Sequence, residues 1–142
     1  MSCEHFPTAP DSDKSWWMKL NWQKTPYEGV ELCLLHREID PKNSDVPLFT
    51  IMAMKLEPKS IVPLHIHKRD DETPAWSEAL DFLHGGKFKI YWKNSTQDIL
   101  EPVTTSVASR QAIGIENLDD KSLVFTSTMI KGFTDYREIE TL

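Results

Sequence analysis

The chain has 142 residues, of which 39% are apolar and 27% charged, values typical of one soluble globular domain. Its 22 acidic and 16 basic residues give a formal net charge of −6. The basic residues are scattered, which argues against a nucleic-acid partner. Because there is no signal-peptide pattern and no stretch near the roughly 18 apolar residues of a membrane span, we expect a cytoplasmic protein with no membrane partner.

The N-terminal region divides into two parts. Residues 1–15 are polar and lack hydrophobic periodicity, so we predict a flexible arm there and a single domain over residues 16–142. The domain opens with "SWWMKLNWQKTPYEGV", where three tryptophans and Tyr27 lie close together. Aromatic side chains in such number usually bury their area against a core or a partner subunit. We expect this segment to cover a sheet edge in a homodimer, with stacking on a ligand as the alternative.

The rest of the chain has the pattern of short strands joined by turns. Nine prolines against five glycines are spread along it, and apolar residues alternate or run continuously between turn signals. We find no helical crossover of the kind that parallel strands need, so the pattern predicts an all-β sandwich or barrel. The predicted strands cover residues 29–39, 48–58, 60–67, 78–94, 98–108, 111–118 and 122–133.

Three details of this strand assignment are specific enough to test. The nearly continuous apolar run over 48–58 predicts a strand buried on both faces. The segment 78–94 divides at Gly85-Gly86 into two apolar runs, which predicts a hairpin. The turn-rich tetrapeptide 94–97, "NSTQ", predicts a turn before the next strand.

Two histidines separated by one residue, His65 and His67 in "PLHIH", are the most informative feature of the sequence. On a strand, residues two apart point to the same face, and their Cα atoms lie about 6.6 Å apart. Two imidazoles can converge from there on one metal ion, at bond lengths of about 2.0–2.1 Å. The pair predicts either a metal site or a polar pocket, with Leu64 and Ile66 facing the opposite way.

The surroundings of this pair resemble the first motif of the cupin superfamily, G-x5-H-x-H-x3,4-E-x6-G. His65 and His67 match the two histidines, and "EALDFLHG" matches E-x6-G, with Glu78 as the acid and Gly85 as the glycine. The resemblance extends over about residues 46–131 and implies a cupin-type double-stranded β-helix, or jelly-roll barrel. It also implies a small-molecule ligand and a divalent metal, such as Fe, Mn, Ni or Zn, held by His65, His67 and Glu78.

The loop inside this motif is longer than the cupin pattern expects. Ten residues, "KRDDETPAWS", separate His67 from Glu78 where three or four are usual, so Glu72 is an alternative motif acid. We prefer Glu78, because the glycine count from Glu72 ends on Ala79 inside an apolar run. The loop is either a solvated segment or a lid, in which Glu72 and Trp76 contact the ligand.

The second cupin motif, G-x5-P-x-G-x2-H-x3-N, is degenerate in this chain. Its closest counterpart is "SVASRQAIGIEN", in which Asn117 matches the final asparagine but Ile113 stands where the motif has histidine. Isoleucine cannot bind a metal. Gln111 is the nearest polar side chain, and its amide oxygen is a weak ligand compared with imidazole, so we predict it in the substrate pocket.

The sequence therefore supports three hypotheses of function. The first is a metal-dependent enzyme of the dioxygenase, isomerase or lyase type, with a two-histidine, one-carboxylate site or with Glu78 as the catalytic base. The second is a metal-free, non-enzymatic cupin that binds a small metabolite or a partner protein, as the missing second-motif histidine suggests. The third is a β-sandwich interaction module with a chance His-x-His. Fold alone does not choose among them.

Overall fold

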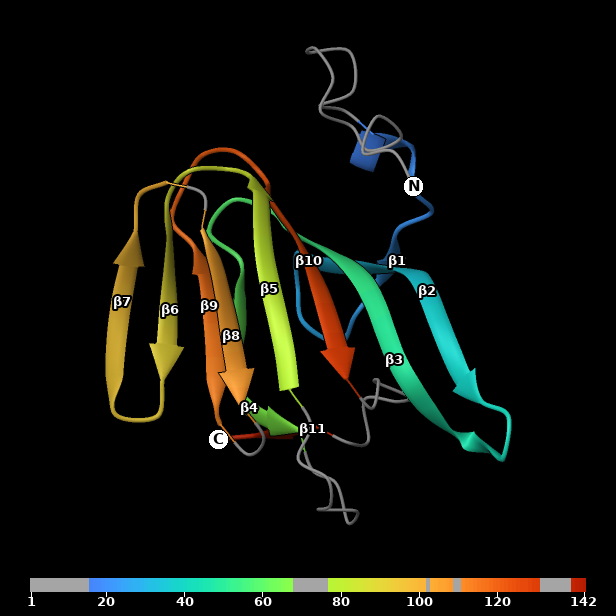
Figure 1. Cartoon of the computed structure of the whole chain (residues 1–142). Helices are drawn as coiled ribbons and strands as arrows, with labels where there is room; N and C mark the ends of the chain where they lie inside the picture. The colour runs from blue at the N-terminus through green and yellow to red at the C-terminus, as the bar shows by residue number, and fades with distance from the viewer. Residues whose placement is uncertain (1–15, 68–76, 102, 109–110, 131–138) are drawn as a thin grey trace.

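The strands of this chain form two antiparallel sheets. The computed structural model describes residues 16–67, 77–101, 103–108, 111–130 and 139–142. The larger sheet has the strand order β1-β2-β3-β10-β5-β8, and the smaller has the order β11-β4-β9-β6-β7. In Figure 1 the larger sheet runs from β8 and β5 through β10 and β3 to β2.

The only helical element in the described ranges is a short 3₁₀ helix, Trp16–Lys19. No helix in this part of the chain is long and apolar enough to cross a membrane. The predicted all-β class is thus confirmed. The strands are β1 Gln23–Lys24, β2 Val30–Asp40, β3 Asn43–Leu56, β4 Ile61–His67, β5 Ser77–His84, β6 Phe88–Trp92, β7 Ser95–Ile99, β8 Thr104–Ala108, β9 Ile113–Asn117, β10 Leu123–Ile130 and β11 Ile139–Thr141.

The hydrophobic core lies between the two sheets. Phe82 of β5 stacks on Phe88 of β6 with ring centroids 4.2 Å apart, and Phe125 of β10 packs against Phe82 at 4.8 Å. Removal of this apolar surface from water is the main force that holds the sheets together. The other buried members of the core are Val30, Leu56, Val62, Leu80, Ile90, Ile99, Val107, Ile113, Ile115 and Leu123.

The predicted hairpin at Gly85-Gly86 is wrong in its pairing. The turn is present, and Gly85 has a φ of +96°, a region that favours glycine. However, β5 pairs with β8 and β10, whereas β6 pairs with β7 and β9. The chain crosses from one sheet to the other at this turn, because the apolar faces of both strands pack against each other through Phe82 and Phe88.

Two further assignments need correction or refinement. The predicted strand 98–108 is broken between β7 and β8, and the predicted turn 94–97 lies mostly within β7, because the chain turns at Lys93-Asn94. Polar residues fit β7 because it is an edge strand with four exposed side chains. The part of the run 48–58 up to Leu56 lies in the interior strand β3, where the neighbours Met52 and Ala53 are both buried, as predicted, while residues 57 and 58 follow the strand and are exposed.

The tryptophan-rich segment packs onto the larger sheet. Gln23 and Lys24 pair with β2 and cover part of its edge, as predicted. The ring of Trp22 lies 4.8 Å from the Lys55 ammonium, and the rings of Trp17 and His84 are 4.9 Å apart. The predicted arm over 1–15 lies outside the described residues, and the homodimer stays a prediction.

Asn117, the motif asparagine, has a structural role. Its side chain is fully buried, and its amide nitrogen donates to the carbonyl oxygens of Leu56 and Lys121 at 3.0 and 2.8 Å. Its amide oxygen accepts a hydrogen bond from the backbone N–H of Asp119. The side chain thereby ties the end of β9 to β3 and to the turn before β10, and satisfies backbone groups that burial would otherwise leave unpaired.

Candidate functional site

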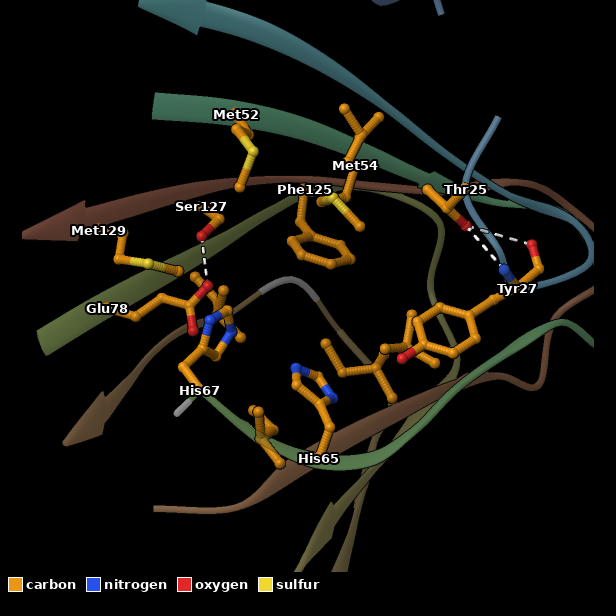
Figure 2. A pocket seen from close by; sticks show the side chains of 15 residues that line it. Thr25, Tyr27, Met52, Met54, His65, His67, Glu78, Phe125, Ser127 and Met129 are labelled. Atoms are coloured by element: carbon orange, nitrogen blue, oxygen red, sulfur yellow. Dashed lines mark hydrogen bonds between the residues drawn. The ribbon is translucent and has the colours of Figure 1, made fainter. Parts of the chain in front are cut away.

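A cavity lies between the sheets, beside the histidine pair. Its volume is about 70 Å³, roughly five times the 15 Å³ that one buried water requires. Figure 2 shows the side chains around it. They are Thr25, Tyr27, Leu32, Met52, Met54, Val62, His65, His67, Glu78, Leu80, Ile113, Ile115, Phe125, Ser127 and Met129.

A β-bulge in β4 points both histidines into this cavity. Val62 is paired with Ile115 and His65 with Ile113, so three steps along β4 match two steps along β9. Paired residues on neighbouring strands share a face. With strict alternation from Val62, His65 would point out of the cavity; the extra residue reverses the alternation, so Val62, His65 and His67 all line it.

Gly114 makes room for this bulge. A Cβ atom at Gly114 would lie 2.8 Å from the backbone nitrogen of Leu64 and 3.0 Å from the carbonyl oxygen of Val62. Backbone atoms cannot move aside as a flexible side chain can. The absence of a side chain at Gly114 therefore allows β9 to approach the bulge, and the bulge determines where His65 points.

Three ionisable side chains are buried in the cavity wall. His65 and His67 are each 8% exposed and Glu78 is 7% exposed. The histidines come from β4 in the smaller sheet and Glu78 from β5 in the larger one. The imidazole centroids are 5.3 Å apart, and Figure 2 shows both rings and the Glu78 carboxyl group around the same cavity. The structure thus brings together the three residues that the first motif predicts.

The tautomer of His65 follows from its backbone contact. Nδ1 lies 2.8 Å from the carbonyl oxygen of Pro63, and a carbonyl only accepts, so Nδ1 carries the proton. Burial lowers the pKa of His65, and the Pro63 hydrogen bond offsets part of this effect. The neutral ring then has Nε2 as its acceptor nitrogen.

Glu78 is paired with Ser127 of β10. The Ser127 hydroxyl donates to Oε2 of Glu78, as the dashed line in Figure 2 marks. Burial raises the pKa of Glu78, and the Ser127 hydrogen bond counteracts this only in part. Desolvation of the carboxylate is the larger effect, so the site favours the protonated acid.

Tyr27 lines one side of the cavity and contacts the C-terminal strand β11. Tyr27 lines the wall, and its hydroxyl lies 3.4 Å from that of Thr141. The turn before β2 holds Tyr27 in place, since Thr25 Oγ1 accepts from its backbone N–H at 3.1 Å. Strand β11 pairs with β4, with Thr141 opposite His65. Tyr27 therefore contacts the C-terminal strand at Thr141, the residue that pairs with His65.

The arrangement does not fit a three-ligand metal centre. Across the described residues, no group of three or more His, Cys, Asp or Glu side chains is placed so that it could hold a metal ion. Ile113, at the position of the missing motif histidine, lines the cavity beside His65, its pairing partner on the neighbouring strand. The segment that corresponds to the second motif thus lines the cavity, as expected from its match to that motif, but it contributes an apolar side chain.

Other predicted pocket residues have different outcomes. Gln111 is exposed and does not line this cavity, because it precedes the first residue of β9 rather than occupying one of its inward positions. The proposed lid residues Glu72 and Trp76 lie outside the described residues. Glu78, preferred over Glu72 as the motif acid, is in the cavity.

Several site residues were missed by sequence reasoning. Ser127 interrupts the apolar run of β10 on the same face as Phe125 and Met129, and a polar residue at a core position is a signal that could have been used. Met52 and Met54 gave no such signal, because methionine in an apolar strand reads as ordinary core.

Replacement of Gly114 tests the role of the bulge. In Gly114→Ala, the methyl group must displace the β4 backbone, so we expect the free energy of unfolding to fall by about 2 kcal/mol. Gly86→Ala is the control, because its Cβ would meet only the flexible Asp119 carboxylate at 3.3 Å. We expect a change below about 0.5 kcal/mol there. Chemical denaturation measures both; equal losses would mean that the close approach at Gly114 has no special role.

The pH dependence of stability tests the raised pKa of Glu78. Between its ordinary pKa of 4.5 and the higher folded value, the folded protein holds a proton that the unfolded chain has released. Stability contributed by this group therefore falls as the pH rises through that window. Glu78→Gln removes the titration and keeps an acceptor for Ser127, so the variant should be more stable than the wild type at pH 8, with the difference shrinking below pH 4.5.

His65 acts in the opposite direction, since a lowered pKa makes stability rise with pH up to its ordinary value of 6.5. We therefore compare the free energy of unfolding of Glu78→Gln with that of the wild type at each pH, measured by urea denaturation. Glu101→Gln, at an exposed position, is the control and should show no such trend. A flat Glu78→Gln difference from pH 4 to 8 would contradict the raised pKa.

The fold has many relatives of known structure, although the sequence matches no protein-family model and no curated protein. Protein SO0799 from Shewanella oneidensis superposes with a TM-score of 0.68 at 14% identity, over 94% of this chain and 85% of that one. The Cnp3 cupin domain of Schizosaccharomyces pombe has a TM-score of 0.63 at 14% identity, over 81% and 71%.

An enzyme is also among these structures. The polyketide cyclase RemF from Streptomyces resistomycificus has a TM-score of 0.62 at 11% identity, over 88% of this chain and 81% of its own. Identities this low establish the fold and not the activity. The two-sheet topology and these superpositions show that this chain has the cupin fold, a double-stranded β-helix.

Proposed function

We propose that the protein is a small-molecule cupin that binds its ligand in the cavity between the sheets, against His65, His67 and Glu78. The observation that carries this proposal is the burial of three ionisable side chains in one largely apolar cavity. Such burial costs free energy unless each group is compensated. Convergent polar groups in an apolar pocket are typical of ligand sites.

The same groups support acid–base chemistry on a bound molecule. His65 offers a neutral imidazole with Nε2 as acceptor, and Glu78 offers a carboxyl group whose pKa burial raises. A base and an acid held in one cavity are the pair that proton-transfer reactions need. RemF, a polyketide cyclase, is an enzyme built on this fold. The site therefore suits an enzyme as well as a binding protein.

A cavity-filling substitution tests where the ligand binds. Leu32 of β2 lines the cavity, whereas Leu34, two residues further along, is 45% exposed and does not. Leu32→Trp should fill the cavity and weaken binding of benzyl alcohol, used as a small probe, at least about tenfold relative to Leu34→Trp and the wild type. Saturation-transfer NMR measures the binding. Undetectable binding by the wild type, or equal binding by all three proteins, would refute the cavity as the site.

A metal-dependent enzyme is the second candidate, with His65, His67 and Glu78 as ligands of a divalent ion. One observation favours it: the Nδ1–H of His65 is held by a backbone carbonyl, the orientation that metal-bound imidazoles usually have. The ion would act as a Lewis acid toward an oxygen-bearing substrate. This candidate requires the three donors to come closer together than they do in this structure.

Metal analysis of protein purified without an affinity tag separates the two candidates. The metal candidate predicts about one ion per chain, lost in the His65→Ala/His67→Ala double variant. The matched control is His36→Ala/His84→Ala, because neither histidine lines the cavity. Our leading proposal predicts no stoichiometric metal in any of the three proteins. An ion lost only from the first double variant would favour the second candidate instead.

A further inference from the structure

The walls of the cavity and its polar end point to a particular class of ligand. We infer, on the basis of the proposed function, that the cavity selects an uncharged molecule with an apolar body and one hydroxyl group, an alcohol or a phenol. The hydroxyl lies at the end formed by His65, His67, Glu78 and Ser127.

The apolar body is matched by walls from both sheets. Met52, Met54 and Met129 line the larger sheet's side, and Ile113 and Ile115 line the other. Branched side chains give a firm surface, whereas methionine is flexible and adapts to irregular shapes. Transfer of a ligand's apolar atoms from water to these walls is favourable by about 25 cal/mol per Å². Most of the binding free energy is expected from this contact.

The described lining has no counter-charge for an anion. It contains no lysine and no arginine, so a carboxylate or phosphate placed there would lose its hydration without an ionic partner. Burial of an unpaired charge costs far more than a hydrogen bond returns. The walls thus select against acidic ligands.

A cation is disfavoured at the same end for a related reason. Glu78 is the single acidic side chain in the described lining, and its Oε2 already accepts from the Ser127 hydroxyl. An ammonium group there could pair only with an ionised Glu78, and this pair is costly to bury, because the ammonium loses its hydration and burial raises the pKa of the carboxyl group. This end therefore offers hydrogen bonds more readily than an ionic partner for a ligand ion.

A hydroxyl group complements what this end does offer. The Pro63 carbonyl holds the proton of His65 on Nδ1, so Nε2 presents a lone pair to a donor. A ligand O–H can donate to that nitrogen and still accept from a second group. A purely apolar ligand leaves the buried acceptor without a partner, and a matched hydrogen bond is worth about 1 kcal/mol, or about fivefold in affinity.

Four probes that share one aromatic ring test this inference: toluene, benzyl alcohol, benzoate and benzylammonium, each titrated at pH 7.5 with the wild-type protein. Because the ring is common to all four, differences in affinity report the head group. We expect benzyl alcohol to bind about fivefold more tightly than toluene, and at least about tenfold more tightly than either ion.

His65→Phe tests the acceptor, because it keeps the ring and removes the nitrogen. The preference for benzyl alcohol over toluene should fall to about one, while toluene binds as before. His84→Phe, with His84 outside the cavity, should keep the fivefold preference.

The outcomes separate this inference from the proposed function. If no probe binds, or if all bind equally well to Leu32→Trp, the cavity is not the site and the proposed function fails with the inference. Suppose instead that toluene or one of the two ions binds as tightly as benzyl alcohol, and that Leu32→Trp abolishes this binding. The cavity is then the site, and only the ligand class is wrong. The wild-type series decides this even if His65→Phe does not fold.

Discussion

The extra residue in β4 decides what the cavity contains. A strand that alternates strictly from Val62 would send His65 and His67 out of the cavity, and the wall from the smaller sheet would be apolar. The bulge reverses the alternation, and two neighbouring strands keep it in place. On one side Ile113 of β9 pairs with His65, and Gly114 has no side chain that would clash with the β4 backbone. On the other side β11 pairs with His65 and His67 directly.

Burial makes the site both costly and chemically useful. The apolar surroundings that stabilise the core also destabilise ionised Glu78 and protonated His65, so their pKa values move in opposite directions. Each group is partly compensated by one hydrogen bond, from Ser127 to the acid and from the imidazole to the Pro63 carbonyl. The result is a hydrogen-bonding end in a cavity otherwise lined mainly by hydrocarbon and thioether groups, with Thr25 and Tyr27 as the other polar side chains.

Ile113 distinguishes this cavity from one built around three imidazoles. It is the pairing partner of His65 on the neighbouring strand β9, at the position where the second cupin motif has a histidine. An apolar side chain there extends the hydrophobic wall up to the polar end. At this position isoleucine contributes an apolar surface to the cavity, where a histidine would contribute a nitrogen able to coordinate a metal.

Local sequence patterns predicted the fold class and the turn at Gly85 well, but they did not predict which strands pair with one another. The all-β class and the turn at Gly85 follow from alternation and glycine chemistry, and both are present. The hairpin prediction failed because strands on either side of a turn can bury their apolar faces against each other in separate sheets, as Phe82 and Phe88 do. The inward placement of His65 was expected from its spacing to His67, but that spacing could not reveal the bulge on which it depends.

By itself the sequence determined that the chain is all-β, that His65 and His67 share one face, and that Ile113 interrupts the second motif. These features follow from the side-chain period of a strand and from residue identity, which are local. Only the tertiary structure decided that Glu78 lines the same cavity as the histidines, that Ser127 pairs with Glu78 and that Gln111 lies outside this cavity. Those outcomes depend on which strands from the two sheets face each other across the core, and strand pairing between distant segments is set by the packing of the whole chain.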